Sequence, residues 1–221
     1  TAAIKLGLAL TWELVLPHKH ERYHRRRAQQ LVNTTIGLGP TFIKIGQSLS
    51  TRIDFLPPIY IEALSQLQDR VPAFDVTKAI EIIETELGTS MQSLFAEFDP
   101  IPIAAASLGQ VHKAKLRTGV DVVIKVQRPG LQQLFELDFK VIDKLLWWVA
   151  LFLPAKRSHE LRAIYQEFFA LLFQEIDYTK EGQNAERFRE NFKDSKIVTS
   201  PKIYWQYTTG KVLTMSYLPG I

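Results

Sequence analysis

Cysteine is absent from this 221-residue chain, so it can form neither disulfide bonds nor thiolate metal sites. No apolar run reaches the ~18 residues expected of a membrane-spanning helix, and we find no glycine- or serine-rich linker and no internal repeat. The net charge of +4 is too small by itself to indicate a nucleic-acid partner. The chain is 46% hydrophobic and 23% charged, which is ordinary for one or two globular domains. It begins with threonine and lacks a signal-peptide layout, so we expect a segment of a longer protein.

The stretch from Ile103 to Val126 predicts a β-hairpin. Residues 111–116 form a first short strand, and Arg117-Thr118-Gly119 supplies a turn in which the glycine can adopt positive φ. Residues 120–126 form a second strand, because this segment is rich in β-branched side chains.

One cation, Lys125, lies near the end of the second strand between Ile124 and Val126. Because neighbouring side chains of a strand point to opposite faces, Lys125 shares a face with Val123 and not with its two neighbours. An unpaired charge on a buried face is costly, so we expect Lys125 to have an anionic partner.

The segment before this hairpin has the spacing of a phosphate-binding loop. Ala104, Ala106, Gly109 and Val111 fall at the positions of the kinase pattern G-x-G-x-x-G-x-V, with two of the three glycines replaced by alanine. The run Val-Val-Ile-Lys at 122–125 likewise matches the kinase V-A-I-K strand.

The alanines predict an altered loop. Alanine disfavours positive φ by roughly 1 kcal/mol, so Ala104, Ala105 and Ala106 should hold a different shape, and a short helix start is the one they favour. We expect fewer backbone amides to point at a γ-phosphate, with the Ser107 hydroxyl in place of one of them. The consequence would be little preference for ATP over ADP.

A helix is predicted from Pro40, which suits a first turn. Phe42, Ile45 and Leu49 recur at helical spacing and are expected to form its buried stripe. Lys44 and Gln47 lie on the other face. Gly46 sits between them at a cost of roughly 1 kcal/mol against alanine, which a close approach of another backbone would explain.

Together these stretches resemble the UbiB-like (aarF-domain) atypical kinases. That family is known for an alanine-rich nucleotide loop, a K-x-G-Q motif and an E-x-D motif, and all three occur here in the family's order. The resemblance covers roughly Gly39 to Ile221. The motifs that carry it are Lys44-Ile45-Gly46-Gln47, the Ala104–Val111 loop, Val123-Ile124-Lys125-Val126 and Glu175-Ile176-Asp177.

The resemblance implies an α+β fold without its second lobe. Residues 1–100 would form a helical extension, and residues 101–221 a kinase-like N-lobe with a five-stranded antiparallel sheet and a C-type helix. The last two strands would be Pro201–Tyr207 and Lys211–Tyr217, around the turn Thr208-Thr209-Gly210.

The resemblance also implies roles for single residues. Residues 159–191 predict one long helix or two, and in the family the helix that bears E-x-D is the C helix. Glu181 would pair with Lys125, and Lys44 would contact Glu175 or Asp177. In the linker between lobes, Tyr217 and Leu218 would meet the adenine. A solvated acidic face is the plainer explanation of these carboxylates.

The cofactors and activity follow from the same resemblance. The chain would bind ATP or ADP through Ala104 to Ser107 and Lys125, while Mg would be held by the missing lobe, since no metal ligands are evident here. The complete protein would be an atypical kinase-like ATPase or phosphotransferase acting in isoprenoid-quinone or prenyl-lipid metabolism. Without a catalytic loop, this chain alone is expected to be inert.

Two segments leave the partner class open. The apolar stretch 2–16 with the basic cluster His18–Arg27, and the run Leu145–Leu153 with its two tryptophans, suit a membrane surface inside the cell or an organelle. Packing against neighbouring helices explains both patterns as well. A non-catalytic lipid-binding or chaperone-like module and a peripheral membrane scaffold therefore remain alternatives to the enzyme, and nucleic acid is disfavoured.

Overall fold

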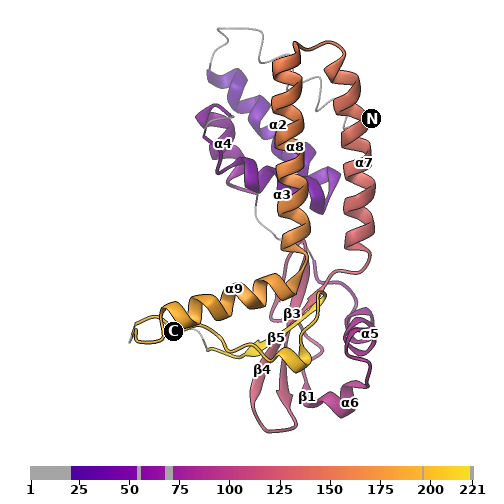
Figure 1. Ribbon diagram of the computed structural model, residues 1–221, viewed down its shortest axis with the longest axis vertical. Helices are drawn as coiled ribbons and strands as arrows, with labels where there is room; N and C mark the ends of the chain where they lie inside the picture. The colour runs from indigo at the N-terminus through magenta and orange to yellow at the C-terminus, as the bar shows by residue number, and fades with distance from the viewer. Residues whose placement is uncertain (1–20, 54–55, 68–71, 196, 220–221) are drawn as a thin grey trace. The chain divides into compact units, whose positions relative to one another are not determined.

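The computed structural model describes residues 21–53, 56–67, 72–195 and 197–219 (Figure 1). Two compact units, Thr1–Asp69 and Arg70–Ile221, make up the chain. The predicted apolar stretch 2–16 and the first residues of the basic cluster lie outside the described residues.

Three helices form the described part of the first unit: α2 (Glu21–Leu38), α3 (Pro40–Leu49) and α4 (Pro58–Leu64). They pack around Val32 and Leu64, together with Leu67 just beyond α4. The predicted helix from Pro40 is therefore confirmed.

The predicted buried stripe of α3 is wrong. The buried residues are Thr41, Ile43 and Gly46, whereas the predicted stripe of Phe42, Ile45 and Leu49 is only partly buried. The reason is Gly46: a Cβ there would lie 2.5 Å from Leu67 Cδ1 and 3.4 Å from Leu64 Cδ2. The close approach that the glycine predicted is thus made by side chains and not by a second backbone.

The second unit is built on an antiparallel sheet in the order β1-β3-β4-β5, with β2 also paired to β3. The predicted hairpin is present, and Val111 lies opposite Lys125 in its register. The α+β class and the five-stranded sheet are as predicted. The strands are β1 (Phe95–Phe98), β2 (Ala104–Ala105), β3 (Gly109–Leu116), β4 (Asp121–Gln127) and β5 (Val212–Ser216).

The five strands are not all the predicted ones. Residues 201–207 were expected to form a strand, yet only Ile203 bridges to Met215 before the 3-10 helix η1 (Trp205–Tyr207) turns the chain. Thr208 Oγ1 donates to Tyr204 O at 3.0 Å, and Thr214 Oγ1 donates to Tyr207 O at 2.7 Å. These hydroxyl groups bond to backbone carbonyl oxygens that would otherwise be available for pairing with a neighbouring strand.

Helices cover both faces of the sheet. On one face α5 (Val76–Leu87) and α6 (Met91–Leu94) pack against Val122, Ile124 and Val126. On the other face α9 (Tyr178–Asn191) packs against β5.

A helical hairpin is inserted between β4 and α9. It consists of α7 (Leu131–Ala150) and α8 (Ala155–Glu175), which contact one another along a row of aromatic rings that includes Phe139 and Phe173. Figure 1 shows the two helices running side by side away from the sheet. No helix among the described residues has the length and apolarity that crossing a membrane requires.

Candidate nucleotide site

Lys125 and Glu181 form the predicted ion pair. Lys125 Nζ lies 2.9 Å from Glu181 Oε1 and 2.7 Å from Oε2, so both carboxylate oxygens accept from one ammonium group. The side chains are 28% and 42% exposed respectively. Exposed pairs of this kind contribute about 0–1 kcal/mol to stability, so the pair serves mainly to orient the lysine.

The aromatic ring of Tyr178 supports this lysine. Lys125 Nζ lies 4.7 Å from the ring centroid, within the range of a cation–π contact. Tyr178 is fully buried, and its backbone N–H donates to Gly210 O at 3.0 Å. Burial, and secondarily the charge of Glu181, raise the pKa of the Tyr178 phenol, so the ring stays neutral. Sequence analysis missed Tyr178, and its only signal was its place directly after the E-x-D motif.

The E-x-D motif lies at a helix junction and not on one helix. Glu175 is the last residue of α8, whereas Asp177 caps α9 by accepting from Thr179 N at 3.0 Å. The expectation that the C-type helix bears the motif is therefore wrong, because a capping aspartate starts a new helix here. Glu181 occupies the first turn of that helix, which directs it toward the sheet.

Two glycines allow α9 to approach the strands. A Cβ at Gly182 would lie 2.9 Å from Trp205 Cη2 and 3.3 Å from Leu213 Cδ1. A Cβ at Gly109 would collide with Tyr178 Oη and with the carbonyl of Val126. Gly109 is the one loop glycine that this chain keeps, and packing accounts for it.

The alanine loop is extended and not helical. Ala104 and Ala105 pair with Val111 and Gln110 as strand β2, and Ala106 N donates to Gly109 O at 2.8 Å. The expected short helix start is thus wrong, because the ladder to β3 outweighs the helix preference of alanine. The Ala106 amide is used inside the loop, and Ser107 is fully buried.

Arg128 forms hydrogen bonds that fix this loop, a role that sequence analysis did not predict. One of its terminal nitrogens donates to Pro72 O at 2.9 Å and to Ala106 O at 3.3 Å, and its guanidinium lies over the ring of Phe74. Burial lowers the pKa of Arg128. Gln110 adds a second tie, because its Oε1 accepts from Phe74 N at 2.9 Å. The segment before α5 is therefore fastened to the loop by two side chains.

The remaining predicted site residues lie elsewhere. Tyr217 follows β5, and the centroid of its ring lies 4.4 Å from Lys113 Nζ. Leu218 is 43% exposed. Gln47 belongs to the first unit and donates to Leu67 O at 2.9 Å. Lys44 belongs to the same unit, so its contact with the E-x-D carboxylates stays a prediction. Within the described ranges no group of three His, Asp or Glu side chains could hold a metal ion.

Three comparisons place the chain among known proteins. Residues 66–221 match the model of the ABC1 atypical kinase-like domain. The chain is 55% identical over 216 residues to protein sll0095 of Synechocystis sp., covering 96% of this chain and 38% of that protein. It is 52% identical over 198 residues to ACTIVITY OF BC1 COMPLEX KINASE 8, chloroplastic, of Arabidopsis thaliana, covering 88% and 26%.

A solved structure shares the fold. The complex of Rv3197 with erythromycin from Mycobacterium tuberculosis superposes with a TM-score of 0.60 at 26% identity, covering 80% of this chain and 44% of that one. The chain spans less than half the length of each of these relatives. The domain match extends over most of the chain, and the fold and the Lys125–Glu181 pair agree with the kinase-like N-lobe that the motifs predicted. The chain belongs to the ABC1 atypical kinase-like family.

Proposed function

We propose that this chain is the nucleotide-binding, regulatory half of an atypical kinase-like ATPase or phosphotransferase. The observation that carries the proposal is the Lys125–Glu181 ion pair, beside the alanine loop. Kinases need such a pair to orient the lysine on the α- and β-phosphates of ATP.

The residues around Lys125 fit a phosphate ligand. An ammonium group has three N–H donors, and the two oxygens of Glu181 accept two of them. The side chain is 28% exposed, so a phosphate oxygen has access to the remaining donor. Ala104 to Ser107 and Tyr217 with Leu218 are the further residues proposed to contact the nucleotide, while Mg would neutralise phosphate charge through ligands outside this chain.

The alanine loop supports weak discrimination between ATP and ADP. The Ala106 amide donates to Gly109 O, so it does not point at a γ-phosphate. Lys44 of the K-x-G-Q motif is proposed to reach the nucleotide and to contact Glu175 or Asp177. Such a placement would disfavour protein substrates and favour ATP hydrolysis or a small or lipidic acceptor. We therefore propose action at a membrane, on an isoprenoid-quinone or prenyl-lipid precursor.

The test is nucleotide binding by the intact protein with Lys125→Met. Loss of the ammonium should weaken ATP binding at least about tenfold in calorimetry, because one charged contact to phosphate is worth about 1.4 kcal/mol or more. Lys115→Met is the matched control, since Lys115 lies on the same sheet face but pairs with Glu97 and Asp121. Equal affinity of both variants for ATP would reject the site.

A second candidate function is a peripheral membrane scaffold. It is favoured by the exposure of Trp147 and Trp148, which are 53% and 59% exposed on α7. A scaffold would sediment with vesicles and bind no nucleotide, whereas the proposed enzyme would do both. Nucleotide calorimetry and vesicle sedimentation on one preparation therefore separate the two.

A further inference from the structure

The α7–α8 hairpin places its connection far from the nucleotide site. A helix rises 1.5 Å per residue, so the 20 residues of α7 span about 30 Å. Both other ends are tied to the sheet, because α7 follows β4 closely and α8 runs into α9. The connection therefore lies about one helix length, roughly 30 Å, from the start of α7 beside β4. Figure 1 shows the hairpin extending away from the sheet. We call residues 144–159 the hairpin tip.

The hairpin tip presents four large apolar side chains to solvent. Phe152 is 83% exposed, and Trp147, Trp148 and Leu151 are between 53% and 59% exposed. The two indole rings stand edge to face with centroids 5.3 Å apart. Contiguous apolar surface of this kind is uncommon on a soluble domain and marks an interaction site.

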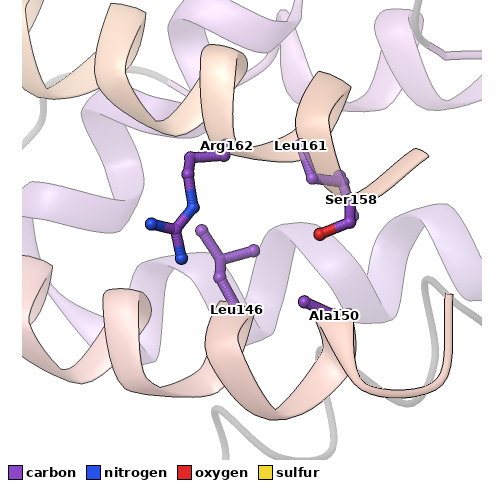
Figure 2. Close-up of a pocket in the computed structure, with 5 residues that line it drawn as sticks. All are labelled: Leu146, Ala150, Ser158, Leu161 and Arg162. Atoms are coloured by element: carbon purple, nitrogen blue, oxygen red, sulfur yellow. The ribbon is translucent and has the colours of Figure 1, made fainter. Parts of the chain in front are cut away.

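The facing sides of the two helices are closed. A pocket of about 10 Å³ lies between them, lined by Leu146 and Ala150 of α7 and by Ser158, Leu161 and Arg162 of α8 (Figure 2). This volume holds about one water molecule. This pocket is too small for a ligand larger than water, so the outward side chains are the ones considered for a partner.

Three basic side chains lie on the hairpin tip. Lys144, Lys156 and Arg157 are all exposed, and the exposed carboxylates Asp143 and Glu160 lie immediately outside residues 144–159. Tryptophan favours the interface between water and lipid, where its ring is apolar and its N–H stays hydrated. Basic side chains next to such rings are attracted to anionic headgroups.

We propose that the hairpin tip inserts into the headgroup region of an anionic lipid bilayer. Trp147, Trp148 and Phe152 enter the boundary with the acyl chains, and the basic side chains contact lipid phosphates. A tip that projects on two helices suits a planar, yielding surface better than a protein pocket, and its three exposed basic side chains favour anionic headgroups. This inference rests on the proposed action at a membrane and names the surface that makes the contact.

The test is sedimentation of the intact protein with vesicles of phosphatidylcholine, alone or mixed with phosphatidylglycerol. The wild type should sediment with the mixed vesicles. Trp147→Ala with Trp148→Ala, and separately Lys156→Glu with Arg157→Glu, should lower the partition coefficient about tenfold. Leu137→Ser and Lys140→Glu are matched controls on α7 closer to the sheet, and both should sediment like the wild type.

Each outcome decides a different point. If the wild type ignores both vesicles, membrane action itself is rejected together with the tip. If it sediments but the tip variants sediment equally well, the tip assignment fails while membrane action stands. If the tip variants keep vesicle binding and lose a protein partner, the surface is a protein interface and the proposal is overturned. Phe152→Ser decides the matter should the double tryptophan variant unfold, because an 83% exposed side chain contributes little to the fold.

Discussion

The two faces of the sheet differ although the same strands build both. On one face Val122, Ile124 and Val126 are fully buried under α5, and His112 beside them is buried as well. On the other face Val123 is nearly buried, whereas Lys125 keeps 28% of its side chain exposed toward Glu181. Side chains alternate between the two faces along β4, so neighbouring residues of one strand serve different ends. One face contributes to stability, and the other carries the site.

Ile124→Ala should produce the largest effect and sharpen this contrast. Truncating a fully buried side chain leaves a cavity, so the free energy of unfolding should fall by about 2–5 kcal/mol. Lys125→Ala, one residue away, should lower it by less than about 1 kcal/mol, because its ion pair is partly exposed. Urea denaturation monitored by circular dichroism measures both. If the free energy of unfolding fell equally in the two variants, the two faces of the sheet would contribute equally to stability, contrary to this interpretation.

Gly182→Ala tests how closely α9 approaches the site face. The added methyl would meet Trp205 and Leu213, so we expect a loss of about 1–3 kcal/mol from overpacking. Nucleotide binding should weaken as well, because Glu181 moves with the helix.

Gly37→Ala is the matched control for that change. Gly37 lies in α2 with nothing within 4 Å of the position of an added Cβ. Alanine there should raise the free energy of unfolding by about 0.5–1 kcal/mol. If both variants were stabilised, the contact of α9 with Trp205 and Leu213 would not be tight.

Ala105→Gly tests the loop at the end of the site face. Glycine frees the backbone of β2 to adopt other conformations, at a cost of about 0.5–1 kcal/mol in strand order. The ratio of ATP to ADP affinity should change by a few-fold in calorimetry on the intact protein. A constant ratio would make the loop a packing element only.

His112 should give the smallest effect, and only in acid. Burial lowers the pKa of His112, while its contact with Asp99 opposes that shift. The unfolded state, with a histidine pKa of about 6.5, therefore takes up the proton first as the pH falls. Stability should be constant above about pH 6.5 and decline below it until the folded form also titrates. The variant His112→Gln should lose this decline, and equal slopes for both proteins would contradict the assignment.

Local patterns were enough to predict the centre of the second unit. The β3–β4 hairpin follows from β-branched residues around a Gly119 turn, and the face of Lys125 follows from alternation. Glu181 came from the spacing of a motif, and no local pattern would have chosen it among the acidic residues nearby.

Features that depend on contacts between distant segments were not predicted. Strand β1 has a bulge between Phe95 and Glu97, which breaks its period of two. Ala104 and Ala105 favour helix locally, yet pairing with β3 decides their conformation. Gly46 sets the inward face of α3, because Leu64 and Leu67 approach the helix closely at this residue. A prediction from hydrophobicity alone does not consider how closely neighbouring side chains can approach.

The position of β5 has a consequence for the order of folding. Strands β3 and β4 are joined by a short turn, so they can pair early, whereas β4 meets β5 only after residues 128–211 have been looped out. Closing a long loop costs more entropy than closing a turn, which slows the second pairing. Leu213 lies opposite Lys125 in that late pair. We therefore expect β4, which carries Lys125, to remain an exposed sheet edge until the α7–α8 insertion has folded. Before that point a nascent chain would be most prone to aggregate.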